Sequence, residues 1–330
     1  MKMKKNLNFG NYLKKISKRR SFICGVKSYQ LNKKEIFFLK KYKPWGVILF
    51  TRNIKNIKQT QDLTKSIKEI FNDKKYPIII DEEGGRVSRL QNIIDTSNFS
   101  SEYFGKLYKI NKTKFSLYVE VYINQISYLL NLLGININSV PVLDLFRKSS
   151  HKIIGDRSYS QDPNEVSKIG DKVIDGFSRN NILTIIKHIP GHGLAMKDSH
   201  KKLPIINKDF NYLLKKDFKP FMKKKSYLAM TAHILLKKID KNNCVTHSKK
   251  IINIIRKHIG YKNIIMTDDI SMRALKFNIE VNTKMSFNAG CNLVLHCNGN
   301  LNQMTKVAKN SPLLSDFLIK KTSQMITKLS

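Results

Sequence analysis

Short runs of apolar, mostly β-branched residues recur along the chain, and each is followed by a segment long enough for a helix. Because these runs are nearly continuous rather than alternating, they predict strands with both faces covered, as in a parallel sheet. Helix-sized segments between such strands indicate repeated βα units. The eight predicted strands cover 22–26, 46–50, 77–81, 137–144, 183–188, 227–233, 264–268 and 293–297.

The clearest predicted helix begins at Asp162, which is placed to cap it, with Pro163 and Glu165 in its first turn. An apolar stripe at helical spacing follows. Its members are Val166, Ile169, Val173, Ile174 and Phe177. The segment 102–133 is long enough for one or two helices, and 301–330 is expected to close the fold with helical material.

Eight βα units favour a single (β/α)8 barrel of the TIM type over residues 1–330. An open, doubly wound sheet is the alternative, since it is built from the same units. The chain has no linker rich in Pro, Gly or Ser, so we expect one domain. Residues 1–20 are interpreted as a basic N-terminal extension.

The net charge is +37, from 61 basic and 24 acidic residues. Such a charge is compatible with a nucleic-acid-binding protein. The lysines are scattered, however, and the sequence has no aromatic RNA-binding motif, zinc spacing or arginine-rich block. A general bias towards Lys, Asn and Ile explains the composition better, so we do not expect a nucleic-acid partner. A positive field would still attract anionic small substrates.

No apolar run approaches the roughly 18–20 residues that a membrane span needs, and no apolar segment follows the basic N-terminus. We therefore expect neither a membrane partner nor a signal peptide. The four cysteines lack CxxC spacing, which predicts reduced thiols and a cytoplasmic protein. No metal or other cofactor is expected, and the oligomeric state is predicted to be a monomer.

Polar residues follow several predicted strands at their carboxyl ends, where a barrel carries its active site. An Asp or Lys that directly follows a buried strand is costly to bury unless a polar group meets it, which singles out Asp81, Lys187 and Asp268. Carboxylates, cations and imidazoles are the groups that cleavage of a sugar requires. The residues at the predicted rim are Asp81, Asp144, Arg157, Lys187, His188, His233, Asp268 and Asp269.

Several of these positions also have a purely structural interpretation. Asp144 and Asp269 could cap the following helix or pair with a lysine at the rim. His233 could be a core histidine with satisfied nitrogens, and His192 could be an ordinary loop residue. Gly84 and Gly85 are interpreted as forming a tight turn rather than a loop that binds phosphate.

The sequence KHIPGHGLAMKDSH carries the most specific chemistry. Its loop, 190–201, is interpreted as a mobile catalytic loop. Asp198 lies two residues before His200, and a carboxylate so placed can orient an imidazole and stabilise its protonated form. The pair therefore suits a general acid/base near neutral pH.

In order along the chain, these motifs resemble the bacterial β-N-acetylhexosaminidases of glycoside hydrolase family 3. The matching segments are GVILFTRN, IDEEGGRVSRL, PVLD, IGDRSY, KHIPGHG with DSH, MTAHI, IIMTDDISM and AGCNLVLHCN. The resemblance implies a retaining, two-step hydrolysis with Asp268 as nucleophile and His200 as acid/base, assisted by Asp198. The sugar-binding positions that it implies are Asp81, Arg89, Arg157, Lys187 and His188.

The family's usual substrate is N-acetylglucosamine β-linked to an anhydro-muramic acid or its peptide, which implies recycling of cell-wall fragments. The chain departs from the family at four positions: Leu194 replaces a usual Asp, Glu82 a common Gln, Ser160 a Gly and Ile189 a Phe. None removes a catalytic group. The alternatives left open are a family 3 glucosidase, a phosphorylase, and a barrel that binds sugar without cleaving it.

Overall fold

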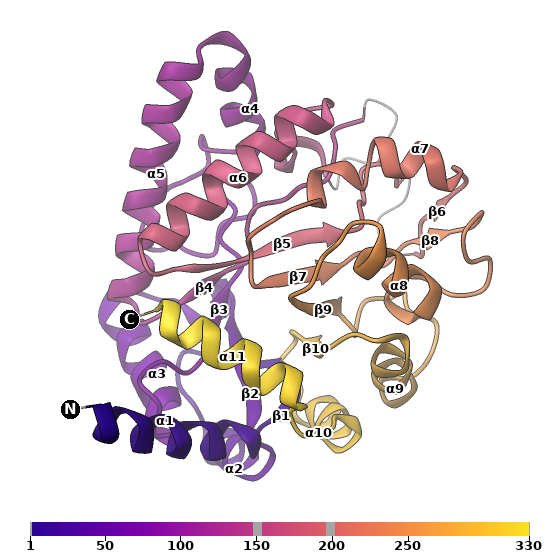
Figure 1. The fold of residues 1–330 in the computed structure, drawn as a ribbon. Helices are drawn as coiled ribbons and strands as arrows, with labels where there is room; N and C mark the ends of the chain where they lie inside the picture. The colour runs from indigo at the N-terminus through magenta and orange to yellow at the C-terminus, as the bar shows by residue number, and fades with distance from the viewer. Residues whose placement is uncertain (1, 148–153, 196–201, 330) are drawn as a thin grey trace.

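A computed structural model describes residues 2–147, 154–195 and 202–329. Within these residues, parallel strands close into a barrel in the order β1-β10-β9-β7-β5-β4-β3-β2 (Figure 1). The barrel strands are β1 (Arg20–Gly25), β2 (Pro44–Leu49), β3 (Ile78–Ile80), β4 (Ile137–Asn138), β5 (Leu183–Ile189), β7 (Leu228–Thr231), β9 (Ile264–Asp269) and β10 (Leu293–His296). The predicted (β/α)8 barrel is confirmed, and the open-sheet alternative is wrong.

Helices follow the strands and cover the outside of the barrel (Figure 1). They are α1 (Lys2–Ser17), α2 (Lys33–Tyr42), α3 (Ile57–Ile70), α4 (Ser101–Ile110), α5 (Lys112–Leu132), α6 (Pro163–Arg179), α7 (Phe210–Lys215), α8 (Lys249–Lys257), α9 (Ile279–Ala289), α10 (Leu301–Asn310) and α11 (Asp316–Lys328). Short 3₁₀ helices cover Thr51–Asn53, Gly155–Arg157, Lys219–Phe221 and Val245–His247. Asp162 caps α6 as predicted, accepting the N–H groups of Asn164 and Glu165.

Strand β4 is much shorter than the predicted 137–144. Pro141 has no N–H for a sheet ladder, and pairing with β5 resumes beyond it only as an isolated bridge between Val142 and Lys187. The Asn138 side chain instead bonds to the backbone of Glu82, donating to its carbonyl at 2.9 Å and accepting its N–H at 3.1 Å. Sequence analysis also missed a two-stranded parallel sheet of β6 (Ile205–Ile206) and β8 (Leu235–Leu236), because strands of two residues leave no periodicity to detect.

Two apolar layers hold the barrel, and neighbouring strand residues alternate between them. On β1, Ile23 belongs to the cluster inside the barrel, to which every barrel strand contributes. Phe22 and Cys24 belong to the larger cluster between the sheet and its helices. This alternation follows from the twofold side-chain period of a strand. It explains why the strand runs are apolar throughout.

Helix α11 closes the end of the barrel where the strands begin. Leu318 and Met325 of α11 pack into the inner cluster, and Trp45 at the start of β2 donates its indole N–H to Thr322 at 2.9 Å. In Figure 1, α11 (yellow) lies across this part of the barrel. The opposite end, where the strands finish, is left to the βα loops.

The region interpreted as a basic extension contains helix α1, which contacts α11. Ile16 is fully buried. Arg19 is buried against Asp73, with Nη2 2.5 Å from Oδ2, and lies over the ring of Tyr76. Ile16 and Arg19, which precede β1, are thus packed into the fold rather than extended into solvent.

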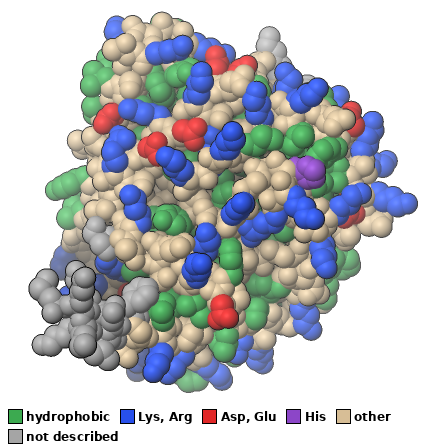
Figure 2. Space-filling view, in the orientation of Figure 1, with side chains coloured by type: hydrophobic (Ala, Val, Ile, Leu, Met, Phe, Trp, Pro, Cys, Tyr) green, Lys and Arg blue, Asp and Glu red, His purple; other side chains and the backbone are tan. Residues whose placement is uncertain are grey.

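Figure 2 shows lysine and arginine side chains scattered over the visible face, separated by hydrophobic and neutral groups. This distribution agrees with the scattered lysines of the sequence and forms no single basic block on that face. In the described part of the chain, no helix combines the length and apolar character that crossing a bilayer requires.

Substitution by alanine should change stability in opposite directions at two helical glycines, Gly105 and Gly10. At Gly105 a Cβ would lie 1.7 Å from the carbonyl oxygen of Tyr159, whereas at Gly10 it would meet nothing within 4 Å. We expect Gly105→Ala to lower the free energy of unfolding by at least about 2 kcal/mol, because backbone must move. Gly10→Ala should be neutral or stabilising, by up to about 1 kcal/mol. Thermal denaturation measures both, and equal melting temperatures would contradict this packing of α4.

Candidate active site

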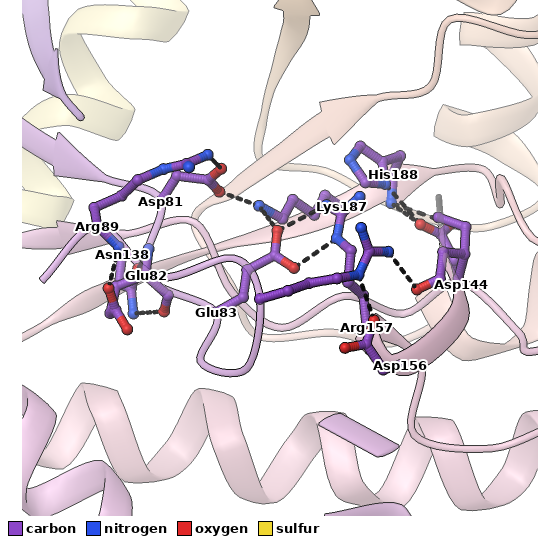
Figure 3. Close-up of polar contacts among 12 residues, drawn as sticks. Asp81, Glu82, Glu83, Arg89, Asn138, Asp144, Asp156, Arg157, Lys187 and His188 are labelled. Carbon is purple, nitrogen blue, oxygen red and sulfur yellow. Dashed lines mark hydrogen bonds and ion pairs between the residues drawn. The ribbon is translucent and has the colours of Figure 1, made fainter. Parts of the chain in front are cut away.

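A cavity of about 360 Å³ lies at the carboxyl ends of the barrel strands. Its wall contains side chains of β2, β5, β7, β9 and β10 and of the segments that follow β3, β4 and β5, and some of these side chains are drawn in Figure 3. The sugar-binding residues and the nucleophile expected from the sequence all line it: Asp81, Arg89, Arg157, Lys187, His188 and Asp268. The structure therefore brings these six predicted residues together.

Charged side chains form a continuous chain of ion pairs in the wall (Figure 3). The Lys187 ammonium, 2% exposed, lies between the carboxylates of Asp81 and Glu83, and is 2.6 Å from the latter. Arg89 donates to the free oxygen of Asp81 at 2.9 Å. Arg157 bonds to both oxygens of Glu83, each at 2.7 Å. Each carboxylate is thereby fixed from two sides.

The cations keep both carboxylates ionised. Burial by itself would raise the pKa of Asp81, but Lys187 and Arg89 outweigh it and hold this pKa well below its usual range. The pKa of Glu83 is lowered in the same way, since Arg157 and Lys187 outweigh its burial. In turn Glu83 raises the pKa of Arg157 despite burial. The neighbouring cations therefore favour the ionised form of both buried carboxylates.

Glu83 is a site residue that sequence analysis missed, although it is the buried centre of this network. It lies two residues beyond Asp81 in the segment DEEGG, of which sequence analysis discussed Asp81, Glu82 and the two glycines but not Glu83. The signal that could have found it is the burial cost of Lys187 and Arg157, since two buried cations require more than one carboxylate.

Asp144 is fully buried, and within the described residues its carboxylate bonds to His188 and His192 rather than to a helix N-terminus or a lysine, so these residues support neither structural interpretation. Its carboxylate is 2.6 Å from Nδ1 of His188 and accepts the backbone N–H of His192 at 2.7 Å. Because Oδ2 accepts from Nδ1, Nε2 of a neutral His188 is left as an acceptor. Burial by itself would raise the pKa of Asp144, but its contacts with His188 and His192 together outweigh burial and lower this pKa.

The two adjacent aspartates of β9 have different surroundings. Asp269 accepts the N–H of Ser271 at 3.0 Å and its hydroxyl at 2.7 Å. These bonds form a local turn, whereas the structural interpretation expected a helix cap or a pair with a lysine. Asp268 accepts the N–H of Asp269 at 2.7 Å through Oδ1. Both line the cavity. The carboxylate of Asp269 is therefore engaged in the turn through both of its oxygens.

His233 is fully buried and satisfied, as its structural interpretation expected. Its Nδ1 is 2.7 Å from the hydroxyl of Thr246 and its Nε2 is 3.0 Å from the carbonyl of Asp269. Since a carbonyl only accepts, Nε2 carries the proton. Burial lowers the pKa of His233, which keeps the ring neutral.

The loop after β5 is described as far as Ala195, so Asp198 and His200 lie outside the described residues. Residues 190–193 are buried. A Cβ at Gly193 would lie 2.3 Å from the carbonyl oxygen of Leu145. The base of the loop is therefore packed directly on the backbone that follows β4.

The four departures from the family pattern each have a defined environment. Ile189 is fully buried in β5, and Leu194 packs partly buried against the outer apolar cluster. The hydroxyl of Ser160 bonds to Glu165 in the first turn of α6. The fourth, Glu82, accepts hydrogen bonds from the Ser88 and Thr96 hydroxyls and the N–H groups of Arg89 and Leu90.

Glu82 thus organises the loop that carries Arg89. Two glycines shape the same loop: Gly84 and Gly85 have φ of +80° and +59°, values that favour glycine. Gly85 donates its N–H to Thr96. The predicted tight turn is confirmed. Among the residues that the structure describes, no cluster of three or more His, Cys, Asp or Glu side chains is placed to hold a metal ion.

Comparison with known proteins agrees with this fold. The family model described as the glycosyl hydrolase family 3 N-terminal domain matches residues 14–329, which is nearly the whole chain. The chain therefore belongs to glycosyl hydrolase family 3 and is a glycoside hydrolase. The resemblance drawn from the sequence motifs is confirmed.

Named relatives and solved structures are similar over most of the chain. A β-hexosaminidase of Nitrosomonas eutropha is 32% identical over 77% of this chain and 73% of its own length. β-Hexosaminidase A of Pseudoalteromonas piscicida is 30% identical over 78% of this chain, which spans about half of that longer protein, 46%. The structure of NagZ from Neisseria gonorrhoeae in complex with N-trifluoroacetyl-D-glucosamine is 26% identical, with a TM-score of 0.83 over 93% of this chain and 90% of that chain.

The adjacent carboxylates of Glu82 and Glu83 should respond oppositely to pH when each is replaced by glutamine. Burial raises the pKa of Glu82, so its stabilising contribution is complete at low pH and is lost as pH rises through the folded-state pKa. Glu82→Gln should therefore gain stability relative to wild type between about pH 4 and about pH 7. One amide oxygen can still accept the three donors that meet Oε2.

Glu83→Gln serves as the matched control. The pKa of Glu83 is lowered in the fold, so its contribution is present above the unfolded-state pKa and is lost as pH falls. This variant should lose more stability at about pH 7 than at about pH 4. Thermal melting at about pH 4 and about pH 7 measures how the effect of each substitution changes with pH. If the effect changed in the same direction for both variants, the opposite pKa shifts of Glu82 and Glu83 would be refuted.

Proposed function

We propose that this protein is a retaining β-N-acetylhexosaminidase that removes β-linked N-acetylglucosamine from anhydro-muropeptides during peptidoglycan recycling. The main observation behind this proposal is that Asp268 and the ion-paired residues around Lys187 line the same cavity. Family membership and the relatives named β-hexosaminidase support the reaction class. The compartment that fits this role is the cytoplasm, and the expected state is a monomer.

The charges in the cavity suit a neutral, polyhydroxylated ligand. Arg89, Arg157 and Lys187 are each paired with a carboxylate, so their charge is compensated before any ligand binds. Asp81 accepts and the cations donate, which matches sugar hydroxyls that both donate and accept. Nε2 of His188 adds an acceptor. A fixed set of such groups can orient a pyranose ring and hold its anomeric carbon in position for attack.

In the first chemical step, the Asp268 carboxylate attacks the anomeric carbon while the leaving oxygen takes a proton. The N–H of Asp269 bonds to Oδ1 of the nucleophile, which fixes the orientation of its carboxylate. The glycosidic C–O bond breaks as the bond to Asp268 forms, giving a glycosyl-aspartate. We assign the proton donor to His200, with Asp198 orienting its ring, on the family resemblance.

In the second step, neutral His200 takes a proton from water, and the hydroxide oxygen displaces Asp268 from the anomeric carbon. An imidazole has an ordinary pKa near 6.5, so it can give and then take a proton near neutral pH. Two inversions at the same carbon retain the β configuration. Asp198 would hold the tautomer that presents the correct nitrogen.

The proposal is tested by assaying wild-type protein on nitrophenyl N-acetyl-β-glucosaminide beside nitrophenyl β-glucoside, with and without inorganic phosphate. We expect the N-acetylated substrate to be preferred and free N-acetylglucosamine to be the product in both buffers. Preference for the glucoside identifies a glucosidase, a sugar phosphate product identifies a phosphorylase, and no turnover identifies a sugar-binding barrel. Each of these results would overturn the proposal.

Asp268→Asn should lower kcat by at least about a thousandfold, equivalent to about 4 kcal/mol, because an amide cannot form the glycosyl ester. Asp269→Asn is the matched comparison, and should mainly lower the melting temperature by weakening the turn to Ser271. A fluorinated sugar that accumulates the covalent intermediate should label Asp268, as read by peptide mass spectrometry. A label on Asp269 would reverse the assignment.

His200→Ala should harm substrates with poor leaving groups more than the nitrophenyl substrate, because nitrophenolate leaves without a proton. We expect a tenfold or greater difference between the two losses in kcat/KM, about 1.4 kcal/mol. Asp198→Ala should show the same selectivity to a smaller extent. Equal losses on both substrates would mean that His200 is not the proton donor.

A further inference from the structure

We propose that His192 is a substrate-binding residue whose uncharged imidazole recognises an uncharged polar group of the saccharide, a hydroxyl or an amide. This inference deepens the proposed function and rests on it. Sequence analysis treated His192 as an ordinary loop residue. Nothing in the chemistry assigned above uses its side chain.

The position of His192 is that of a wall residue. It lies in the loop after β5, lines the cavity and is only 3% exposed. Its ring centre is 5.7 Å from that of His188. The backbone N–H bonds to Asp144 at 2.7 Å, so the main chain is fixed without help from the imidazole.

The bonding of the ring sets it apart from its neighbours. Neither Nδ1 nor Nε2 of His192 bonds to a polar atom of the described residues. The cations and carboxylates around it are paired with one another. A buried polar group without a partner costs about 1–3 kcal/mol, so such groups in folded proteins call for an explanation. A ligand in the cavity that the ring lines supplies one.

The charge of the ring defines what it can bind. Burial lowers the pKa of His192 to about 4, against the attraction of Asp144 and Asp268. Near neutral pH the ring is therefore neutral, with one N–H donor and one acceptor nitrogen. An anionic group would need donors only. A sugar hydroxyl or an acetamido group both donates and accepts, and so matches the ring.

The test compares His192→Phe, which keeps an aromatic ring without polar atoms, with His192→Gln, which keeps a donor and an acceptor. We expect the Phe variant to lose tenfold or more in kcat/KM on nitrophenyl N-acetyl-β-glucosaminide, mainly through a raised KM, and the Gln variant to recover part of that loss. The bond from the backbone of residue 192 to Asp144 survives in both.

His247 provides a matched control. It is also buried, burial also lowers its pKa to about 4, and its Nε2 has no partner among the described residues. It does not line the cavity. His247→Phe should leave kcat and KM unchanged. Equal losses in His192→Phe and His247→Phe would show a general effect of removing a buried imidazole and would overturn the proposal.

Binding of N-acetylglucosamine, followed by titration calorimetry, separates this inference from the proposed function because it needs no turnover. We expect His192→Phe to weaken binding tenfold or more and His192→Gln to weaken it less. Wild-type affinity in the Phe variant, or an equal loss in Phe and Gln with unchanged KM, would overturn the role of His192. If wild-type protein binds the sugar without cleaving it, the proposed hydrolase fails while the binding role is still decided by the variants.

Discussion

The buried ammonium of Lys187 is the constraint around which the end of the barrel is organised. A buried charge costs several kcal/mol unless its partners are close and fully bonded. The partners Asp81 and Glu83 come from the end of β3, whereas Lys187 lies on β5, and β4 separates these strands in the sheet. The ion pairs therefore bridge over a strand and fix the rim as one unit. Removing any single partner would leave a buried charge unpaired, which should lower the free energy of unfolding by about 3–5 kcal/mol.

This constraint separates two scales of electrostatics in the molecule. The whole chain carries a net charge of +37, and basic groups are spread over the face that Figure 2 shows. In the cavity wall, by contrast, Arg89, Arg157 and Lys187 are matched with carboxylates. The field of the whole chain can raise the rate at which an anionic fragment arrives, because it acts at long range. Recognition within the cavity is left to short hydrogen bonds of fixed direction, which suits the hydroxyls of a sugar.

The sequence was sufficient for the barrel because every barrel strand is buried on both faces and so appears as an apolar run. It also predicted the cavity residues that follow those runs directly, such as Asp81 and Lys187. It failed where the signal is not periodic. The apolar run 137–144 includes Pro141, which lacks an N–H for a continuous ladder, and only Ile137–Asn138 forms strand β4. Glu83 was overlooked because its burial depends on cations more than 70 positions away. Pairing across the rim cannot be read from local spacing.

In the motif Pro-Gly-His-Gly after β5, packing explains the two glycines but not the side chain of His192. At Gly191, φ is +136°, and a Cβ would lie 2.8 Å from the carbonyl oxygen of Asp217. At Gly193 a Cβ would collide with the backbone of Leu145. Both glycines are therefore required by close backbone contact, a more direct reason than the mobility that their presence suggests. The N–H of His192 is used as well, by Asp144. What packing leaves unexplained in this segment is the imidazole, and the cavity beside it is where its two nitrogens can be used.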